Sequence, residues 1–312
     1  MLFRSVCYLY SAARAAASIA SSRAPGSMTA STGTPEIGGL TTREALEIKR
    51  EAAARSAYID IGFWGGAVPE NLGSLEPLHE GGVFGFKCFL SPSGVDEFGH
   101  LDREQLLAAM REIAALGSRI IIHAEDPALF GDGGALGQGY ERFLESRPPA
   151  SEQSAIDTII DAVRLTGCRT HILHLSDGRA LPAIRGAKAE GLPITVETCP
   201  HYLLLDETAL ENYSVQAKVS PPLRTAHDRV VLREAVKTGI VDILVTDHAP
   251  HAAHEKDGTL DAAPCGFTGL DLALGLTWKL VDEGILAESD VHRLWCRRPA
   301  EIFGLPCNGF AP

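Results

Sequence analysis

Short apolar runs recur along the chain, separated by longer stretches in which apolar residues repeat at helical spacing. Runs of this length between turn residues are typical of buried strands. Six strands are predicted: Tyr58–Gly62, Val83–Phe89, Ile120–His123, His171–His174, Ile194–Glu197 and Ile243–Asp247. The longer stretches predict helices near residues 41–54, 72–79, 101–116, 151–165, 180–189, 227–236 and 289–296, followed by a turn over residues 298–304. A helix before each strand indicates βαβ units and a parallel sheet.

Polar residues interrupt this apolar pattern in four of the predicted strands. Lys87 lies in the middle of an apolar strand, and three other strands end in His123, His174 and Asp247. A buried ammonium is costly, so such a lysine needs a strong partner, a lowered pKa or a chemical change. Polar side chains at the carboxyl ends of parallel strands are typical of the active site of a TIM-type barrel. One such histidine would more often be a core residue, but four candidates on four strands favour a shared site.

The chemistry of these four residues indicates a metal. Histidine nitrogen and aspartate oxygen are good ligands for zinc, and lysine can join them only as a carbamate. A carboxylated Lys87 would offer two oxygens and could bridge two ions, which would make hydroxide available from a bound water near neutral pH. Asp247 could then bind one ion, accept the proton of the water and pass it to a leaving nitrogen.

Composition narrows the class of protein. The 28 basic and 40 acidic residues give a formal net charge of −12, which argues against nucleic acid or an anionic membrane as partner. The seven cysteines contain no C-x-x-C pair, which fits reduced thiols in an intracellular protein. No apolar run reaches the length of a membrane span.

The amino-terminal segment has a different make-up. Residues 1–40 are predicted to be a disordered or transit-like leader, because the first 35 contain no acidic residue and carry Arg4, Arg14 and Arg23. A misplaced gene start, with coding from Met28, explains the composition equally well. The chain is therefore predicted to be cytoplasmic, or mitochondrial if the leader is a real transit peptide. Residues 41–305 would form the barrel domain and residues 306–312 a tail.

Several motifs, in this order, resemble the allantoinases of the cyclic amidohydrolase family, which are related to dihydropyrimidinases, hydantoinases and dihydroorotases. The motifs span most of the chain from Thr41 to Leu305. They are Asp60–Gly66, Gly85–Leu90, Ser93–Phe98, His123–Glu125, Ser146–Pro149, His171–Ser176, Glu197–Tyr202, Lys218–Arg224 and Thr246–Pro250.

The resemblance implies hydrolysis of allantoin to allantoate at two zinc ions. It implies that Lys87 is the carboxylated bridging ligand, that His123 and His174 hold one zinc, and that Asp247 holds the other and acts as acid and base. The implied substrate contacts come from Ser220, Pro221, Cys265 and Gly266. His201 is assigned a supporting role behind the ligands, and His251 and His254 are expected to be solvated. The resemblance also implies a small cyclic ureide as partner and a homotetramer.

The departures from the family pattern concern the start of the barrel. Family members open with a strand that carries a His-x-His pair, and the 312 residues contain no His-x-His. We therefore expect an α/β protein with a partial TIM-type barrel, in which the first two barrel strands and the family's β-sandwich are missing. At most a partial version of the family's two-zinc site is expected here. Two alternatives remain open: a hydrolase of the dihydropyrimidinase or hydantoinase type, and a non-catalytic amidohydrolase-like scaffold or fragment.

Overall fold

A computed structural model describes residues 39–57, 61–131, 140–210 and 215–305. The predicted leader up to residue 38 and the predicted tail 306–312 lie outside the described residues. Leu40 is buried, and its carbonyl accepts a hydrogen bond from Gly66 N at 2.7 Å. The packed body of the protein therefore includes residue 40, just before the predicted start of the barrel.

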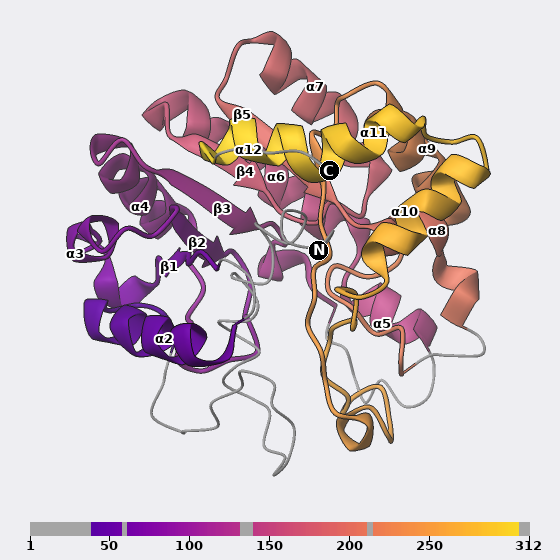
Figure 1. The fold of residues 1–312 in the computed structure, drawn as a ribbon, viewed down its shortest axis with the longest axis horizontal. Helices are drawn as coiled ribbons and strands as arrows, with labels where there is room; N and C mark the ends of the chain where they lie inside the picture. The colour runs from indigo at the N-terminus through magenta and orange to yellow at the C-terminus, as the bar shows by residue number, and fades with distance from the viewer. Residues whose placement is uncertain (1–38, 58–60, 132–139, 211–214, 306–312) are drawn as a thin grey trace.

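One parallel sheet organises the molecule (Figure 1). Its six strands are paired in sequence order, and each neighbouring pair is parallel. They are β1 (Gly65–Gly66), β2 (Phe86–Phe89), β3 (Arg119–His123), β4 (Arg169–Ile172), β5 (Ile194–Thr198) and β6 (Ile243–Leu244). The sheet is not closed among the described residues, since β1 and β6 are its two edges. The predicted α/β fold with a partial barrel is confirmed.

The first predicted strand is misplaced. Of Tyr58–Gly62, residues 58–60 lie outside the described part, and residues 61 and 62 are not in a strand. The edge strand is formed instead by Gly65 and Gly66, which pair with Phe86 and Lys87. A Cβ on Gly65 would lie 3.1 Å from the Phe86 ring, so glycine allows the close approach that this pairing needs.

The central strands are buried on both faces, as expected for a parallel sheet covered by helices. All four residues of β2 are buried, as are residues 120–123 of β3. Outside them, α4 (Arg103–Ala115) packs against α6 (Pro149–Thr166), and α6 packs against α7 (Leu181–Ala189). The three helices contact β3, β4 and β5 in turn, so they cover the middle of the sheet.

Local signals explain most helix boundaries. The Thr42 hydroxyl caps the first described helix by accepting from Ala45 N at 3.2 Å, and Asp102 and Gln105 form a capping box on α4. Gly167 ends α6 with a left-handed φ of 64°. The longer helices are α2 (Arg43–Ser56), α4 (Arg103–Ala115), α6 (Pro149–Thr166), α7 (Leu181–Ala189), α9 (Ala226–Lys237) and α10 (Ala273–Asp282). The shorter ones are α3 (Glu76–Glu80), α5 (Tyr140–Ser146), α8 (Pro200–Leu204), α11 (Glu288–His292) and α12 (Arg298–Phe303).

Two predictions at helix ends are wrong. The helix predicted from residue 151 begins two residues earlier, at Pro149, with Pro148 as its N-cap. The predicted turn over residues 298–304 is helix α12, which a π-helical turn, Arg293–Arg297, joins to α11. The helix ends at Gly304, whose φ is 70°, so the glycine marked the end of a helix and not a free turn.

Helix α12 covers the amino end of the sheet, opposite the predicted site. The Phe303 ring lies 5.3 Å from the Trp64 ring and 5.4 Å from the ring of His171, both edge-on. The Arg119 guanidinium lies 6.0 Å from the same ring. Trp64 precedes β1 and Arg119 begins β3, so Phe303 packs where the strands start. The carboxyl ends are left for the residues with metal-binding chemistry.

No helix in the described segments combines the length and the apolar character needed to cross a membrane.

Candidate metal and active site

Two of the predicted ligands face each other at the carboxyl end of the sheet. His123 is the last residue of β3, and His174 follows the neighbouring strand β4. The His123 Nδ1 and His174 Nε2 atoms are 3.1 Å apart, and both residues are buried. Two ligand atoms on one tetrahedral zinc lie about 3.4 Å apart, given bonds of roughly 2.0–2.1 Å. The pair therefore has nearly the spacing that a shared ion requires.

Glu125 orients the first histidine. Its Oε2 atom lies 2.7 Å from His123 Nε2, so the other ring nitrogen, Nδ1, faces His174. The same oxygen accepts hydrogen bonds from Arg147 at 2.7 Å and from the Ser220 hydroxyl at 2.9 Å. Burial opposes ionisation of this carboxyl, but the hydrogen bond to His123 and the charge of Arg147 hold the pKa of Glu125 well below its ordinary value. A carboxylate behind a ligand histidine is a common feature of metal sites.

Glu197 supports the second histidine from β5. Its Oε1 accepts a hydrogen bond from the His174 backbone N–H at 3.2 Å, and its Oε2 lies 2.9 Å from His171 Nε2. His174 needs such support because its φ is 35°, in the left-handed region that non-glycine residues rarely adopt. Strain of this kind is concentrated at functional sites.

Lys87 lies on β2, next to the strand that ends in His123. The side chain is buried, and its Nζ lies 4.6 Å from the centre of the Phe89 ring. Phe89 is the register partner of His123, and the two rings are 5.0 Å apart. The predicted bridging lysine thus contacts the aromatic residue that packs on the first histidine.

Asp247 lies beyond β6, buried and with a φ of 43°. Asp247 and His174 are the two non-glycine residues with positive φ among those described. A carboxylate oxygen of Asp247, the Cys199 thiol sulfur and a ring nitrogen of His201 all lie within 4.8 Å of one another. His248, next along the chain, is half-buried, and burial lowers its pKa.

The predicted substrate-binding residues lie on two loops that contact each other. The Ser220 hydroxyl donates to Glu125, and the Pro221 carbonyl accepts from the Tyr202 hydroxyl at 2.6 Å. Gly266 N donates to the Lys218 carbonyl at 2.9 Å, which joins the loop of Cys265 and Gly266 to the loop of Ser220 and Pro221.

One of the two histidines expected to be solvated in the loop after Asp247 makes a contact within the protein. His251 Nε2 lies 3.0 Å from the Cys265 carbonyl, so the expectation that His251 is solvated is wrong. His254 is exposed, as predicted.

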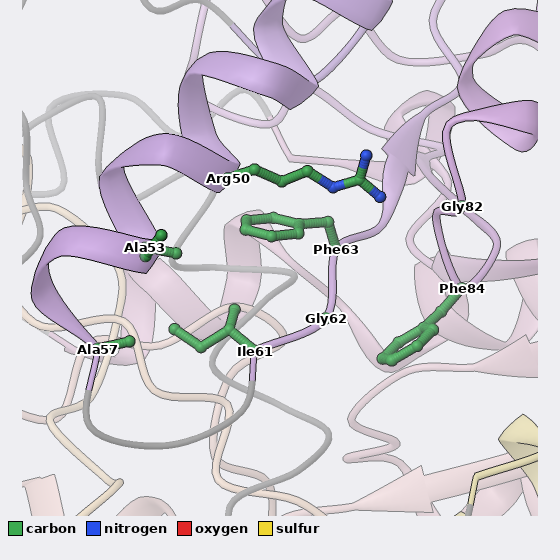
Figure 2. A pocket seen from close by; sticks show the side chains of 9 residues that line it. Arg50, Ala53, Ala57, Ile61, Gly62, Phe63, Gly82 and Phe84 are labelled. Atoms are coloured by element: carbon green, nitrogen blue, oxygen red, sulfur yellow. The ribbon is translucent and has the colours of Figure 1, made fainter.

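A cavity of about 340 Å³ lies elsewhere, at the amino end of the sheet (Figure 2). Figure 2 shows the Arg50 side chain extending from α2 toward the segment that carries Phe63. Phe63 and Phe84, which also line the cavity, precede β1 and β2. The cavity is therefore at the opposite end of the strands from His123 and His174 and does not belong to the candidate site.

Known proteins are similar to this chain over most of its length. No family model matches the chain. The allantoinase of Streptomyces avermitilis is 45% identical over 270 residues, which are 86% of this chain and 61% of that protein. A mitochondrial allantoinase of Aquarana catesbeiana is 36% identical over 264 residues, 82% of this chain and 54% of the relative. The L-hydantoinase (dihydropyrimidinase) from Arthrobacter aurescens superposes with a TM-score of 0.82 at 29% identity, over 86% of this chain and 61% of that one.

The fold is that of the TIM-barrel amidohydrolases, with a sheet that is open among the described residues. Within that class the chain is similar in sequence to allantoinases, as the motifs indicated. The chain spans 54% to 61% of the length of these three proteins.

Proposed function

We propose that the site hydrolyses a cyclic amide, with allantoin as the substrate and allantoate as the product. The observation that carries this proposal is the buried His123–His174 pair, 3.1 Å apart at the carboxyl ends of adjacent strands. The relation to allantoinases selects the substrate within the wider group of cyclic amides.

Under this proposal His123 and His174 would hold one Zn²⁺, Asp247 would hold a second, and a carboxylated Lys87 would serve as a ligand to both. The donor set fits, because imidazole and carboxylate are the ligands zinc prefers and the histidine spacing is close to that of a single ion. Bound in this way, the metal would make hydroxide available near neutral pH and polarise the amide carbonyl.

The residues of the chain supply the remaining steps. Asp247 accepts the proton of the attacking water and returns it to the ring nitrogen that leaves. Glu125 keeps the His123 ring turned so that Nδ1 faces the site. Ser220–Pro221 and Cys265–Gly266 lie on loops beside Glu125 and beside the segment after Asp247, where backbone groups can contact the cyclic amide.

The test is metal content and allantoin ring opening by the purified chain, with zinc and with or without bicarbonate. We expect zinc uptake that rises with bicarbonate and allantoate formation. In His174→Ala we expect loss of allantoate formation and of the bicarbonate-dependent part of the zinc uptake. His254→Ala is the matched control, because His254 is an exposed histidine outside the site. Equal zinc uptake by both variants would contradict the assignment of His174.

A substrate series separates the alternatives. Faster turnover of hydantoin or dihydrouracil than of allantoin would favour the dihydropyrimidinase or hydantoinase type, which the relation to the Arthrobacter aurescens enzyme makes worth testing. Zinc binding without turnover of any member would favour the scaffold interpretation. A homotetramer, a barrel domain over residues 41–305 and a mitochondrial location set by the leader remain proposals that the same preparation and a localisation experiment can test.

A further inference from the structure

A second group of metal-binding side chains lies at the ends of the last two strands. Cys199, His201 and Asp247 are all buried, and one ligand atom of each lies within 4.8 Å of the other two. It is the one group of three or more histidine, cysteine or acidic side chains within such a distance found among the described residues. The family resemblance pairs Asp247 with a His-x-His strand, a motif absent from the 312 residues, and gives Cys199 no metal role.

Backbone contacts between neighbouring strands bring the three residues together. Cys199 follows β5 directly and is the N-cap of α8, which places His201 in the first turn of that helix. Val245 N donates to the Thr198 carbonyl at 3.1 Å, so the end of β6 is held against the end of β5 just before Asp247. The cluster therefore depends on strand pairing and not on a flexible loop.

The surroundings favour a fixed ligand geometry. The His201 ring lies 4.8 Å from the Phe267 ring and 4.3 Å from the Tyr202 ring. Phe267 in turn pairs through its backbone with Ala249, two residues beyond Asp247. These aromatic contacts restrict the imidazole to few orientations while leaving it beside the carboxylate and the thiol.

The donor set suits a borderline divalent ion. Thiolate, imidazole and carboxylate all bind zinc, at bond lengths of about 2.0–2.3 Å, so ligand atoms on one ion lie roughly 3.5 Å apart. An upper limit of 4.8 Å between ligand atoms leaves only a small contraction to reach that spacing. Three protein ligands would leave a fourth position open, as in catalytic zinc sites.

We propose that Cys199, His201 and Asp247 form a metal site of their own for Zn²⁺ or a similar ion. Binding converts the Cys199 thiol to a thiolate, and the proton is released to solvent. The site needs no carbamate on Lys87 and no ligand from β3 or β4. Because it shares Asp247 with the proposed hydrolase centre, it deepens that proposal by naming the ligands of the second ion. It can nevertheless be filled in a chain that does not hydrolyse allantoin.

Cobalt tests the proposal, because Co²⁺ bound to a thiolate gives a near-ultraviolet charge-transfer band that Co²⁺ on nitrogen and oxygen ligands lacks. The full chain is titrated with Co²⁺ without bicarbonate. We expect the band in the wild type, its loss in Cys199→Ser, and a Co²⁺ affinity at least about tenfold weaker with the band retained in His201→Gln. Cys168→Ser is the matched control, since Cys168 is a buried cysteine at the amino end of β4 and should keep the band.

Two outcomes would overturn the proposal: a wild type that binds Co²⁺ without the band, and a band that persists in Cys199→Ser. If Cys199→Ser does not fold, as judged by circular dichroism, His201→Gln decides, and an unchanged affinity in that variant counts against the site. His174→Ala separates this proposal from the proposed hydrolysis. Retention of the band in that variant, together with loss of turnover, would leave the cysteine site standing on its own.

Discussion

The two halves of the site are held in place by different means. At the ends of β3 and β4, the His123 ring is contacted by Glu125 at 2.7 Å and the His174 backbone by Glu197 of β5 at 3.2 Å. On β5 and β6, the Cys199–His201–Asp247 cluster is placed by backbone pairing of the strand ends and by aromatic contacts to His201. Buried carboxylates hold the histidines of the first half in place. Backbone pairing and aromatic packing hold the ligands of the second half.

This difference has a consequence for how each half should respond to change. A ring oriented by a buried, ionised carboxylate loses its orientation when the charge is removed, whatever the strands do. A cluster fixed by strand pairing should tolerate such a change, because its ligands do not share that carboxylate. Substitutions behind one half should therefore leave the other intact, and the predictions below test this from the largest effect to the smallest.

Asp247 is the residue that both halves share under the proposal, so its loss should have the largest effect. Asp247→Asn removes a proton acceptor at the reacting centre, and general acid–base catalysis is worth about 10²- to 10⁴-fold. We expect kcat for allantoin to fall by a factor in that range. Asp257→Asn, an exposed acid in the following loop, should leave kcat unchanged. A comparable loss in both variants would place the effect on the loop and not on the acid.

Glu152 should make the stability of the β4 side depend on pH. Burial raises its pKa to about 7, although Ser176 donates to the carboxylate from both its backbone N–H and its hydroxyl. The folded state then holds the proton on Glu152 more tightly than the unfolded state. The stabilisation that protonated Glu152 gives to the folded state is therefore complete below about pH 4.5 and is lost as pH rises toward 7. The shift corresponds to on the order of 3 kcal/mol.

The measurement is the melting temperature of the wild type and of Glu152→Gln between pH 5 and pH 8. Glutamine mimics the protonated form of Glu152, so the melting temperature of the variant should increase relative to that of the wild type as pH rises. Glu145→Gln, at an exposed position on the preceding helix α5, serves as the control. A difference between Glu152→Gln and wild type that does not change with pH would show that Glu152 titrates normally in the folded protein.

Substitution of Glu125 tests directly whether the two halves of the site respond independently. Glu125→Gln removes the buried charge beside His123 and should weaken metal binding at the His123–His174 pair by about 10- to 100-fold, as for other carboxylates behind ligand histidines. Competition with a chelator measures this loss, and the cobalt–thiolate band of the cysteine cluster should not change. Glu141→Gln, at an exposed position on α5, is the control. Loss of the thiolate band in Glu125→Gln would show that the two halves are one coupled unit.

The sequence predicted which apolar runs form strands β3, β4 and β6, because each run is short and leads into a polar residue. The end of β3 at His123 was predicted correctly, whereas β4 and β6 end two and three residues before His174 and Asp247. Strand order and the parallel arrangement followed from the helix before each run. The edge strand was missed because Gly65 and Gly66 carry no side chains and so no hydrophobic signal. Close approach to Phe86, which the glycines permit, is a tertiary property.

The contacts behind the ligands could not be predicted from local pattern. Glu125 stands two residues after His123 in a quoted motif, but Ser220, which donates to it, is 95 residues away. Cys199 and His201 were recognisable as ligand types, and only the pairing of β5 with β6 places them beside Asp247. The one local signal that pointed to the contacts behind the ligands is a carboxylate two residues after a strand-end histidine.

Phe89 should have the smallest effect, and it tests whether Lys87 is ready to be carboxylated. The ring attracts the Lys87 ammonium from 4.6 Å and so favours the charged amine over the carbamate. Phe89→Leu removes roughly 0.5–1 kcal/mol of that attraction, so the bicarbonate concentration for half-maximal zinc uptake should fall about 2- to 5-fold. Phe98→Leu is the control, because the Phe98 ring packs edge-on against Phe89 at 5.5 Å and repeats the loss of packing. If both variants shift the bicarbonate midpoint equally, packing is the cause. If neither shifts it, zinc uptake does not depend on the state of Lys87, and the ligands on β3 and β4 hold their ion without a carbamate.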